Sequence, residues 1–189
     1  MKHQLKIIIG STRPARKGPA VARWIYELAG QQHAFETELI DLAQIHLPLL
    51  DEEEHPRLKK YRHQHTKDWS AKIDPADAFI FVTPEYNYGY PAPLKNALDC
   101  LFQEWLNKPA ALVSYGGMAG GTRAVQQLRQ VFSAFSMVCI SESVNIPSFG
   151  KHIDMNGVFS ADDKLTKSAL NMLNELGRWS ETLRSMRKV

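Results

Sequence analysis

Hydroxyl-bearing and cationic side chains gather directly after the first apolar run of this chain. The run is Leu-Lys-Ile-Ile-Ile at residues 5–9, and the polar side chains that follow it are Ser11, Thr12, Arg13, Arg16 and Lys17. Pro19 suits the first turn of a helix, and apolar residues recur after it at helical spacing. A helix N-terminus offers unpaired backbone N–H groups and partial positive charge. The pattern therefore predicts a site for a phosphate group or a similar anion.

Two common nucleotide-binding signatures are absent. No Gly-x-Gly-x-x-Gly motif follows the first apolar run, and the chain has no Gly-x-x-x-x-Gly-Lys-Ser/Thr motif. Neither a dinucleotide-binding Rossmann site nor an NTPase loop is indicated. For this loop alone, an exposed cationic turn without a ligand remains the alternative.

Two further loops combine tyrosine, proline and glycine. Residues 84–93 read Pro-Glu-Tyr-Asn-Tyr-Gly-Tyr-Pro-Ala-Pro, and residues 114–123 read Ser-Tyr-Gly-Gly-Met-Ala-Gly-Gly-Thr-Arg. Tyrosine rings and glycine-rich backbone can approach a flat ligand closely. Each loop alone could equally be a packed turn. Together with an anion site, they favour a ligand shaped like a mononucleotide.

Apolar runs alternate with helix-length segments along the whole chain, which is typical of a parallel sheet covered on both faces. We predict strands at residues 5–10, 36–41, 78–83, 110–115 and 137–141. We predict helices at residues 19–29, 66–73, 93–105, 120–132 and 161–184. Ligands of such sheets bind beyond the carboxyl ends of the strands, so the three loops should meet at one edge.

Composition limits the class of protein. The 189 residues, 44 % apolar and 23 % charged, suit a single domain over residues 1–189. A net charge of +3 does not favour a nucleic-acid partner. Cys100 and Cys139 have no paired spacing, and no apolar stretch approaches the roughly 20 residues that span a bilayer. We therefore expect a cytoplasmic protein with no membrane partner.

Residues 47–65 form a polar segment that is too long for a simple connection, and they could be a lid or a partner surface. His63 and His65 lie within this segment. No third ligand lies at a recognisable metal-site spacing from them, so we predict no metal site.

Four motifs together resemble the NAD(P)H-dependent FMN reductase family, which includes quinone, azo-dye and chromate reductases. They are Gly-Ser-Thr-Arg at 10–13, Pro-Glu-Tyr-Asn at 84–87, Pro-Leu-Lys-Asn-Ala-Leu-Asp at 93–99 and Gly-Gly-Met-Ala-Gly-Gly at 116–121. The resemblance implies an α/β fold, the flavodoxin-like three-layer sandwich. Its five-stranded parallel sheet would have the order 2-1-3-4-5, with helices on both faces.

The resemblance also implies FMN as cofactor, NADPH or NADH as co-substrate, and a small-molecule electron acceptor in a ping-pong reaction. No catalytic side chain is required, because the flavin carries the chemistry. The resemblance implies three groups of FMN-binding residues, of which the first would hold the phosphate and the other two would flank the isoalloxazine ring. The first group is Ser11, Arg13, Arg16, Lys17, Gly18, Pro19 and Ala20; the second is Pro84, Glu85, Tyr86 and Asn87; the third is Tyr115, Gly116 and Gly117.

This chain departs from the family pattern at two positions of the phosphate-binding loop. Many members carry Ser where this chain has Gly18 and Asn where it has Ala20. The backbone N–H groups at these positions, with Arg16 or Lys17, would have to compensate.

Other expectations concern neighbouring charges and assembly. We expect Glu85 to be an exposed carboxylate that caps its own turn. Arg123 would meet either a phosphate of the nicotinamide nucleotide or an acidic side chain. In relatives the helix corresponding to residues 93–105 lies in a subunit interface, so a homodimer or homotetramer is expected.

Two other functions stay open. A flavodoxin-type electron carrier is one, although such carriers are usually strongly acidic and this chain is slightly basic. A non-enzymatic flavin-binding module is the other, which the long polar segment and the altered phosphate loop would suit.

Overall fold

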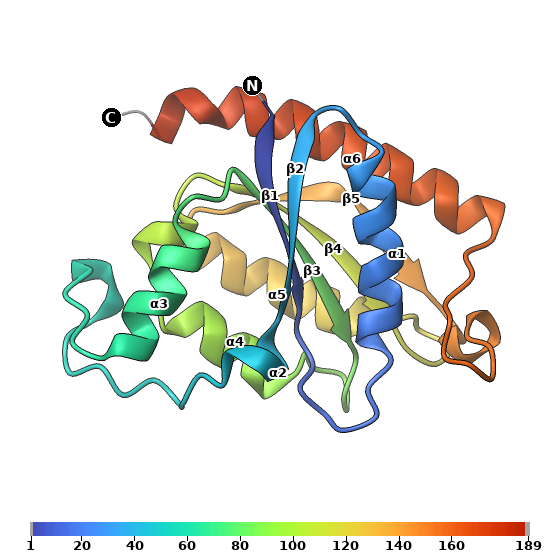
Figure 1. Ribbon diagram of the computed structural model, residues 1–189, viewed down its shortest axis with the longest axis horizontal. Coiled ribbons are helices and arrows are strands. Elements are labelled where there is room, and N and C mark those ends of the chain that lie inside the picture. The colour runs from blue at the N-terminus through green and yellow to red at the C-terminus, as the bar shows by residue number, and fades with distance from the viewer. Residues whose placement is uncertain (1, 188–189) are drawn as a thin grey trace.

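Five parallel strands form the centre of the computed structural model, which describes residues 2–187 (Figure 1). They are β1 (His3–Ile9), β2 (Phe35–Asp41), β3 (Ala78–Pro84), β4 (Pro109–Tyr115) and β5 (Val138–Ile146). Their order is β2-β1-β3-β4-β5, which confirms the predicted flavodoxin-like topology. Every residue of β3 and β4 is buried, because helices cover both faces of the central strands.

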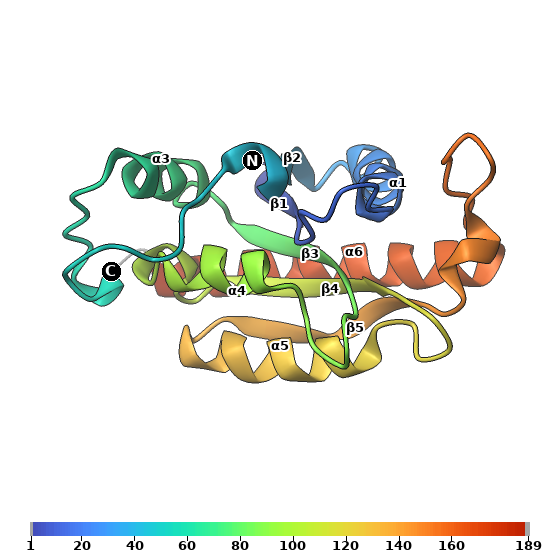
Figure 2. The same ribbon diagram turned by 90° about the horizontal axis from the view of Figure 1, so that it is seen from below.

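Helices pack on both faces of the sheet (Figures 1 and 2). On one face, α1 (Gly18–Gly30) and α6 (Asp163–Leu183) share an apolar cluster with the strands. On the other, α3 (Gln64–Ile73), α4 (Ala92–Asp99) and α5 (Thr122–Ala134) share a second cluster, which contains Trp69 and Trp105. Each helix buries an apolar stripe at the predicted spacing.

Two predicted helices begin or end at other residues in the structure, each for a physical reason. The helix predicted over 93–105 ends at Asp99, and a separate 3-10 turn covers Gln103–Trp105. In a continuous helix the Phe102 N–H would donate to the Leu98 carbonyl, but it donates to Glu104 Oε2 at 3.3 Å, while that carbonyl accepts from Nε1 of the buried Trp105 at 3.0 Å. The helix predicted from residue 120 begins at Thr122, because Gly120 and Gly121 have φ angles of 58° and 84°.

Strand β5 is longer than predicted, ending at Ile146 rather than at residue 141. Residues 141–143 in its second half are polar, so the apolar pattern that predicted the strand stopped before its true end. The pairing of β5 with β4 also shifts register between Ala110 and Leu112. One short helix, α2 (Leu42–Ile45), was not predicted. Asp41 begins it by accepting from the Ala43 N–H at 3.0 Å.

The polar segment 47–65 packs against α3 and α4. Asn96 accepts from the Leu50 N–H at 2.9 Å and donates to the Pro48 carbonyl at 2.7 Å. The fully buried Glu104 accepts from Tyr61 Oη at 2.9 Å and from Ser70 Oγ at 2.6 Å. These hydrogen bonds hold both ends of the segment.

His63 and His65 stack with ring centroids 5.2 Å apart, and His65 Nε2 lies 2.9 Å from Asp51 Oδ1. Within residues 2–187, no group of three or more His, Cys, Asp or Glu side chains could hold a metal ion. No helix in that same range is both long enough and apolar enough to cross a membrane.

Candidate functional site

The loop between β1 and α1, residues 10–17, is called the phosphate loop below, and it turns at the lower edge of the sheet in Figure 1. Gly10 donates its N–H to the Val82 carbonyl at 2.9 Å, and the buried Ser11 side chain lies at its start. Among the described residues, the backbone N–H groups of Thr12 and Ala15 have no hydrogen-bond partner. Ala15 has a φ of 56°, a left-handed conformation that alanine rarely adopts. The loop therefore presents free donors from an unusual backbone.

The three cations of the phosphate loop differ in their surroundings. Arg13 and Lys17 are exposed, whereas Arg16 is half-buried and pairs through Nη2 with Asp41 Oδ2 at the end of β2. The Nε of Arg16 is buried and has no partner among the described residues. A buried donor without an acceptor costs free energy, and an anion at this point would remove that cost. The donor set therefore fits a phosphate group.

Gly18, the first residue of α1, has no room for a side chain. A Cβ at this position would lie 2.8 Å from Tyr115 Oη and 3.2 Å from Ile9 Cγ2. The absence of a serine side chain at position 18 is therefore explained by Tyr115, which is distant in the sequence and fills that space in the fold. At the other departure, the Ala20 N–H already donates to the Lys17 carbonyl at 3.1 Å, so it is not free to replace a missing side chain.

Residues 84–91, from the last residue of β3 to the start of α4, are called the ring loop. A tight turn closes it, because the N–H groups of Tyr86 and Gly89 donate to each other's carbonyl at 2.8 and 2.9 Å. Asn87 and Tyr88, at the centre of this turn, have φ angles of 49° and 72° and are exposed. Such left-handed pairs are typical of two-residue turns. The turn directs the Tyr86 hydroxyl toward the phosphate loop, 2.8 Å from Ser11 Oγ.

Glu85 joins the ring loop to α5. It accepts from the Arg123 backbone N–H at 3.1 Å and from the Arg123 guanidinium at 2.8 Å. The expectation of an exposed carboxylate was wrong, since the side chain is only 11 % exposed and caps α5 rather than its own turn. Burial raises the pKa of Glu85, but the hydrogen bonds from Arg123 outweigh burial and lower it. Arg123 also lies over the Tyr88 ring, with Cζ 4.4 Å from its centroid.

Residues 116–121, between β4 and α5, are called the glycine loop. Gly121 must be glycine, because its φ is 84° and a Cβ would lie 2.7 Å from Ser114 Cβ. The carbonyls of Gly116 and Gly117 accept from the N–H groups of Phe149 and Ser148 at 3.1 and 2.7 Å. These bonds attach the glycine loop to the segment that follows β5.

The three loops meet at the carboxyl edge, as predicted. The Glu85 N–H donates to the Tyr115 carbonyl at 3.3 Å, which links the ring loop to the end of β4. Asp41, Ser148 and Phe149 were not anticipated from the sequence. Asp41 carried one usable signal, since it ends the strand beside β1 at the edge where ligands bind. No sequence signal marked the other two.

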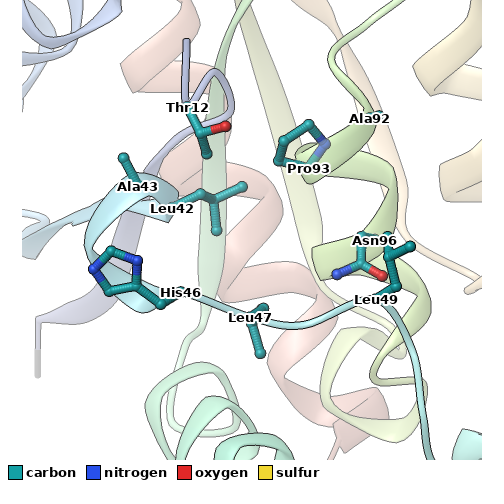
Figure 3. Close-up of a pocket in the computed structure, with 9 residues that line it drawn as sticks. All are labelled: Thr12, Leu42, Ala43, His46, Leu47, Leu49, Ala92, Pro93 and Asn96. Atoms are coloured by element: carbon teal, nitrogen blue, oxygen red, sulfur yellow. The ribbon is translucent and has the colours of Figure 1, made fainter. Parts of the chain in front are cut away.

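A cavity of about 450 Å³ lies beside the phosphate loop (Figure 3). Thr12 of the phosphate loop and Pro93 of α4 stand on opposite sides of it. Most of its wall is aliphatic. The lining residues are Thr12, Leu42, Ala43, His46, Leu47, Leu49, Ala92, Pro93 and Asn96. None belongs to the glycine loop, so the cavity adjoins the phosphate end of the site rather than the predicted ring end.

Known proteins resemble this chain in sequence as well as in fold. The family model described as NADPH-dependent FMN reductase matches residues 4–151. An NAD(P)H-dependent FMN reductase of Schizosaccharomyces pombe is 36 % identical over 184 residues, which cover 96 % of this chain and 91 % of the relative. An NAD(P)H-dependent FMN reductase of Saccharomyces cerevisiae is 38 % identical over 155 residues, covering 75 % of this chain and 80 % of the relative.

Solved structures share the fold. The flavoenzyme NAD(P)H:acceptor oxidoreductase FerB from Paracoccus denitrificans superposes with a TM-score of 0.74 at 23 % identity, covering 95 % of this chain and 98 % of its own. Oxidised flavodoxin 1 from Bacillus cereus superposes with a TM-score of 0.56 at 14 % identity, covering 93 % of this chain and 97 % of its own. Both likenesses concern the flavodoxin-like architecture alone.

Proposed function

The chain belongs to the NADPH-dependent FMN reductase family, and on that premise we propose that it moves hydride from NADPH or NADH to a quinone, a free flavin or a similar small acceptor. Bound FMN would supply the two-electron chemistry, in a ping-pong reaction where the nicotinamide nucleotide leaves before the acceptor enters. The protein's own task is to bind the phosphate, to hold the ring with one face accessible, and to place N–H donors beside it.

The phosphate end of the site carries this proposal. Ser11, Arg13, Arg16 and Lys17 surround the N-terminus of α1, where backbone N–H groups and the helix dipole favour an anion. The single most informative observation is the buried Nε of Arg16, which has no acceptor within the described chain. A phosphate oxygen would supply that acceptor.

The ring end of the site uses the other two loops. We assign the isoalloxazine contacts to Pro84, Glu85, Tyr86 and Asn87 of the ring loop and to Gly116 and Gly117 of the glycine loop. The two glycines directly follow Tyr115 in the chain. Gly18, Pro19 and Ala20 complete the phosphate end. The Glu85–Arg123 pair would keep the ring loop against α5, so that the two walls of the site keep their separation.

We also propose a homodimer or homotetramer in which α4 and the neighbouring segment face another copy. Leu49 of that segment is 80 % exposed and lies with Pro93 and Asn96 of α4 around the cavity, which leaves aliphatic surface beside α4. Asn96 of α4 holds this segment in place through Pro48 and Leu50, so the surface is preformed. Both cysteines are free thiols, which suits a reducing compartment, and we propose the cytoplasm.

One experiment tests the reductase assignment. The purified protein is incubated with FMN, free flavin is removed, and the absorbance of bound flavin is followed without oxygen on addition of NADPH and, separately, NADH. Bleaching by either donor that a quinone then reverses supports the assignment and identifies the donor. Bound flavin that neither donor bleaches would contradict it and favour a binding module. A stable one-electron form during stepwise reduction would favour a flavodoxin-type carrier.

A further inference from the structure

Tyr115 lies at the end of β4, yet its hydroxyl reaches the phosphate end of the site. The side chain is only 3 % exposed and packs edge-on against Phe149, with centroids 5.3 Å apart. Its Oη occupies the space where a side chain at position 18 would begin, 2.8 Å from an ideal Cβ on Gly18. A hydroxyl-bearing side chain at position 18 and the tyrosine at 115 therefore exclude each other in this conformation.

Helix α1 lacks an ordinary N-terminal cap. Its N-cap residue, Lys17, makes no side-chain hydrogen bond to the first turn. The Tyr115 hydroxyl oxygen instead lies beside Gly18, the first residue of the helix, whose backbone acts to lower the pKa of the phenol while burial raises it. The phenol thus lies where the side chain of a Ser or Asp cap normally lies, beside the first-turn N–H groups.

Within residues 2–187, the Tyr115 hydroxyl donates no hydrogen bond to another group of the protein. Arg16 and the Tyr86 hydroxyl also influence the pKa of Tyr115 electrostatically, and the phenol oxygen lies beside Gly18, so it is in the same region as the donors at the start of α1. A phenol hydroxyl can donate its own proton. An anion at this helix N-terminus would accept that proton in a hydrogen bond.

We propose that Tyr115 is a phosphate-end residue: its hydroxyl takes the place of a side chain at position 18, beside the N-terminus of α1, and donates to the phosphate of FMN. This inference rests on the proposed function and deepens it. Its consequence is selectivity, because a donor to the phosphate favours FMN over riboflavin, which has the same ring and no phosphate. A contact with the isoalloxazine ring would affect both flavins equally.

The test compares the affinities of FMN and riboflavin, measured by quenching of flavin fluorescence, in wild type and Tyr115→Phe. The FMN dissociation constant should rise about tenfold or more, since a hydrogen bond to a charged group is lost. The riboflavin constant should change by no more than about twofold, because the phenyl ring still fills the same space. Tyr26→Phe, which removes a hydroxyl from the exposed face of α1, should change neither constant.

A second pair of variants tests the exclusion between positions 18 and 115. Gly18→Ser should weaken FMN binding in wild type, where the new Cβ meets Oη. In the Tyr115→Phe background the same change should strengthen FMN binding, because the clash is gone and the serine hydroxyl replaces the lost donor. The contact with Ile9 Cγ2 is common to both backgrounds and cancels in the comparison.

Each outcome of these measurements either supports the proposed role of Tyr115 or overturns it. Parallel losses of FMN and riboflavin affinity in Tyr115→Phe, or an equal effect of Gly18→Ser in both backgrounds, overturn the role of Tyr115 and leave the reductase assignment intact. Thermal unfolding of each variant separates a lost contact from a lost fold. Should Tyr115→Phe not fold, Gly18→Ala in wild type still decides, since the proposal requires it to weaken FMN more than riboflavin. Wild type that binds neither flavin would overturn the proposed function itself, and this inference with it.

Discussion

The hydroxyl of Ser11 lies 2.8 Å from the hydroxyl of Tyr86, which joins the phosphate loop to a residue 75 positions later in the chain. Ser11 Oγ also accepts from the Arg13 N–H at 3.4 Å. The side chain that the family resemblance assigns to the phosphate is therefore already part of a network between two loops. Binding at the phosphate end and placement of the ring loop are coupled through this contact.

Ser11→Ala and Tyr86→Phe should each weaken FMN binding, by about 1–2 kcal/mol, because each removes one partner of the same hydrogen bond. The double variant should lose less than the sum of the two, since the second change removes a contact that the first has already broken. Fluorescence titration of the three variants measures this coupling. Strictly additive losses would show that the two hydroxyls act independently.

Arg13→Ala should weaken FMN binding by about 1–3 kcal/mol through loss of a charge-assisted contact with the phosphate. Arg13 is exposed and forms no ion pair among the described residues, so stability should change little. The measurement is the FMN dissociation constant, with Arg23→Ala on the exposed face of α1 as the matched control. Unchanged FMN affinity in Arg13→Ala would refute the assignment.

Glu85 should make stability depend on pH in acid. Its pKa in the folded state lies below the ordinary value of 4.5, although burial acts the other way, because Arg123 stabilises the charged form. The stabilisation is present above pH 4.5 and is lost as the pH falls through the lowered pKa. Glu85→Gln should therefore lower the free energy of unfolding by about 1 kcal/mol at pH 7, as for a weakened helix cap.

Urea unfolding at several pH values tests this effect. The difference between wild type and Glu85→Gln should shrink toward zero below the lowered pKa, where the wild-type carboxyl is protonated. Glu27→Gln, at an exposed position of α1, serves as the comparison. A difference that is constant from pH 7 into strong acid would mean that the charge on Glu85 is not what stabilises the pair.

Glu104→Ala should be strongly destabilising, by about 3–5 kcal/mol. The carboxylate is fully buried, and its removal leaves the hydroxyls of Tyr61 and Ser70 without their acceptor. Glu53→Ala, which breaks an exposed ion pair with Arg62, should cost no more than about 1 kcal/mol. The urea concentrations at the midpoints of unfolding of the two variants provide the comparison. Similar midpoints would mean that the loss of stability in Glu104→Ala does not depend on the burial of its carboxylate.

Sedimentation equilibrium should give a mass of two or four chains at micromolar concentration. Leu49→Asp should shift the mass toward one chain, because it places a charge on the aliphatic surface beside α4. Leu39→Asp, at an exposed position of the edge strand β2 away from that surface, should leave the mass unchanged. A single-chain mass for wild type would contradict the proposed assembly.

The sequence by itself determined the strands, most of the helices and the three loops that meet at the carboxyl edge. Burial on both faces requires a continuous apolar run, and β3 and β4 show it directly. Phosphate-loop residues were identifiable because hydroxyls and cations beside a helix start are a local pattern. The strand order came from the family resemblance, and the structure confirmed it.

Only the tertiary structure decided which side chains from different loops touch. Nothing near Gly18 in the sequence indicates that Tyr115 fills the space above it, and nothing near Glu85 indicates that it caps α5. The break after Asp99 likewise depends on the burial of Trp105 among distant residues. Local patterns record whether a residue is buried and in which element it lies, whereas a contact between loops depends on strand order, register and side-chain length together.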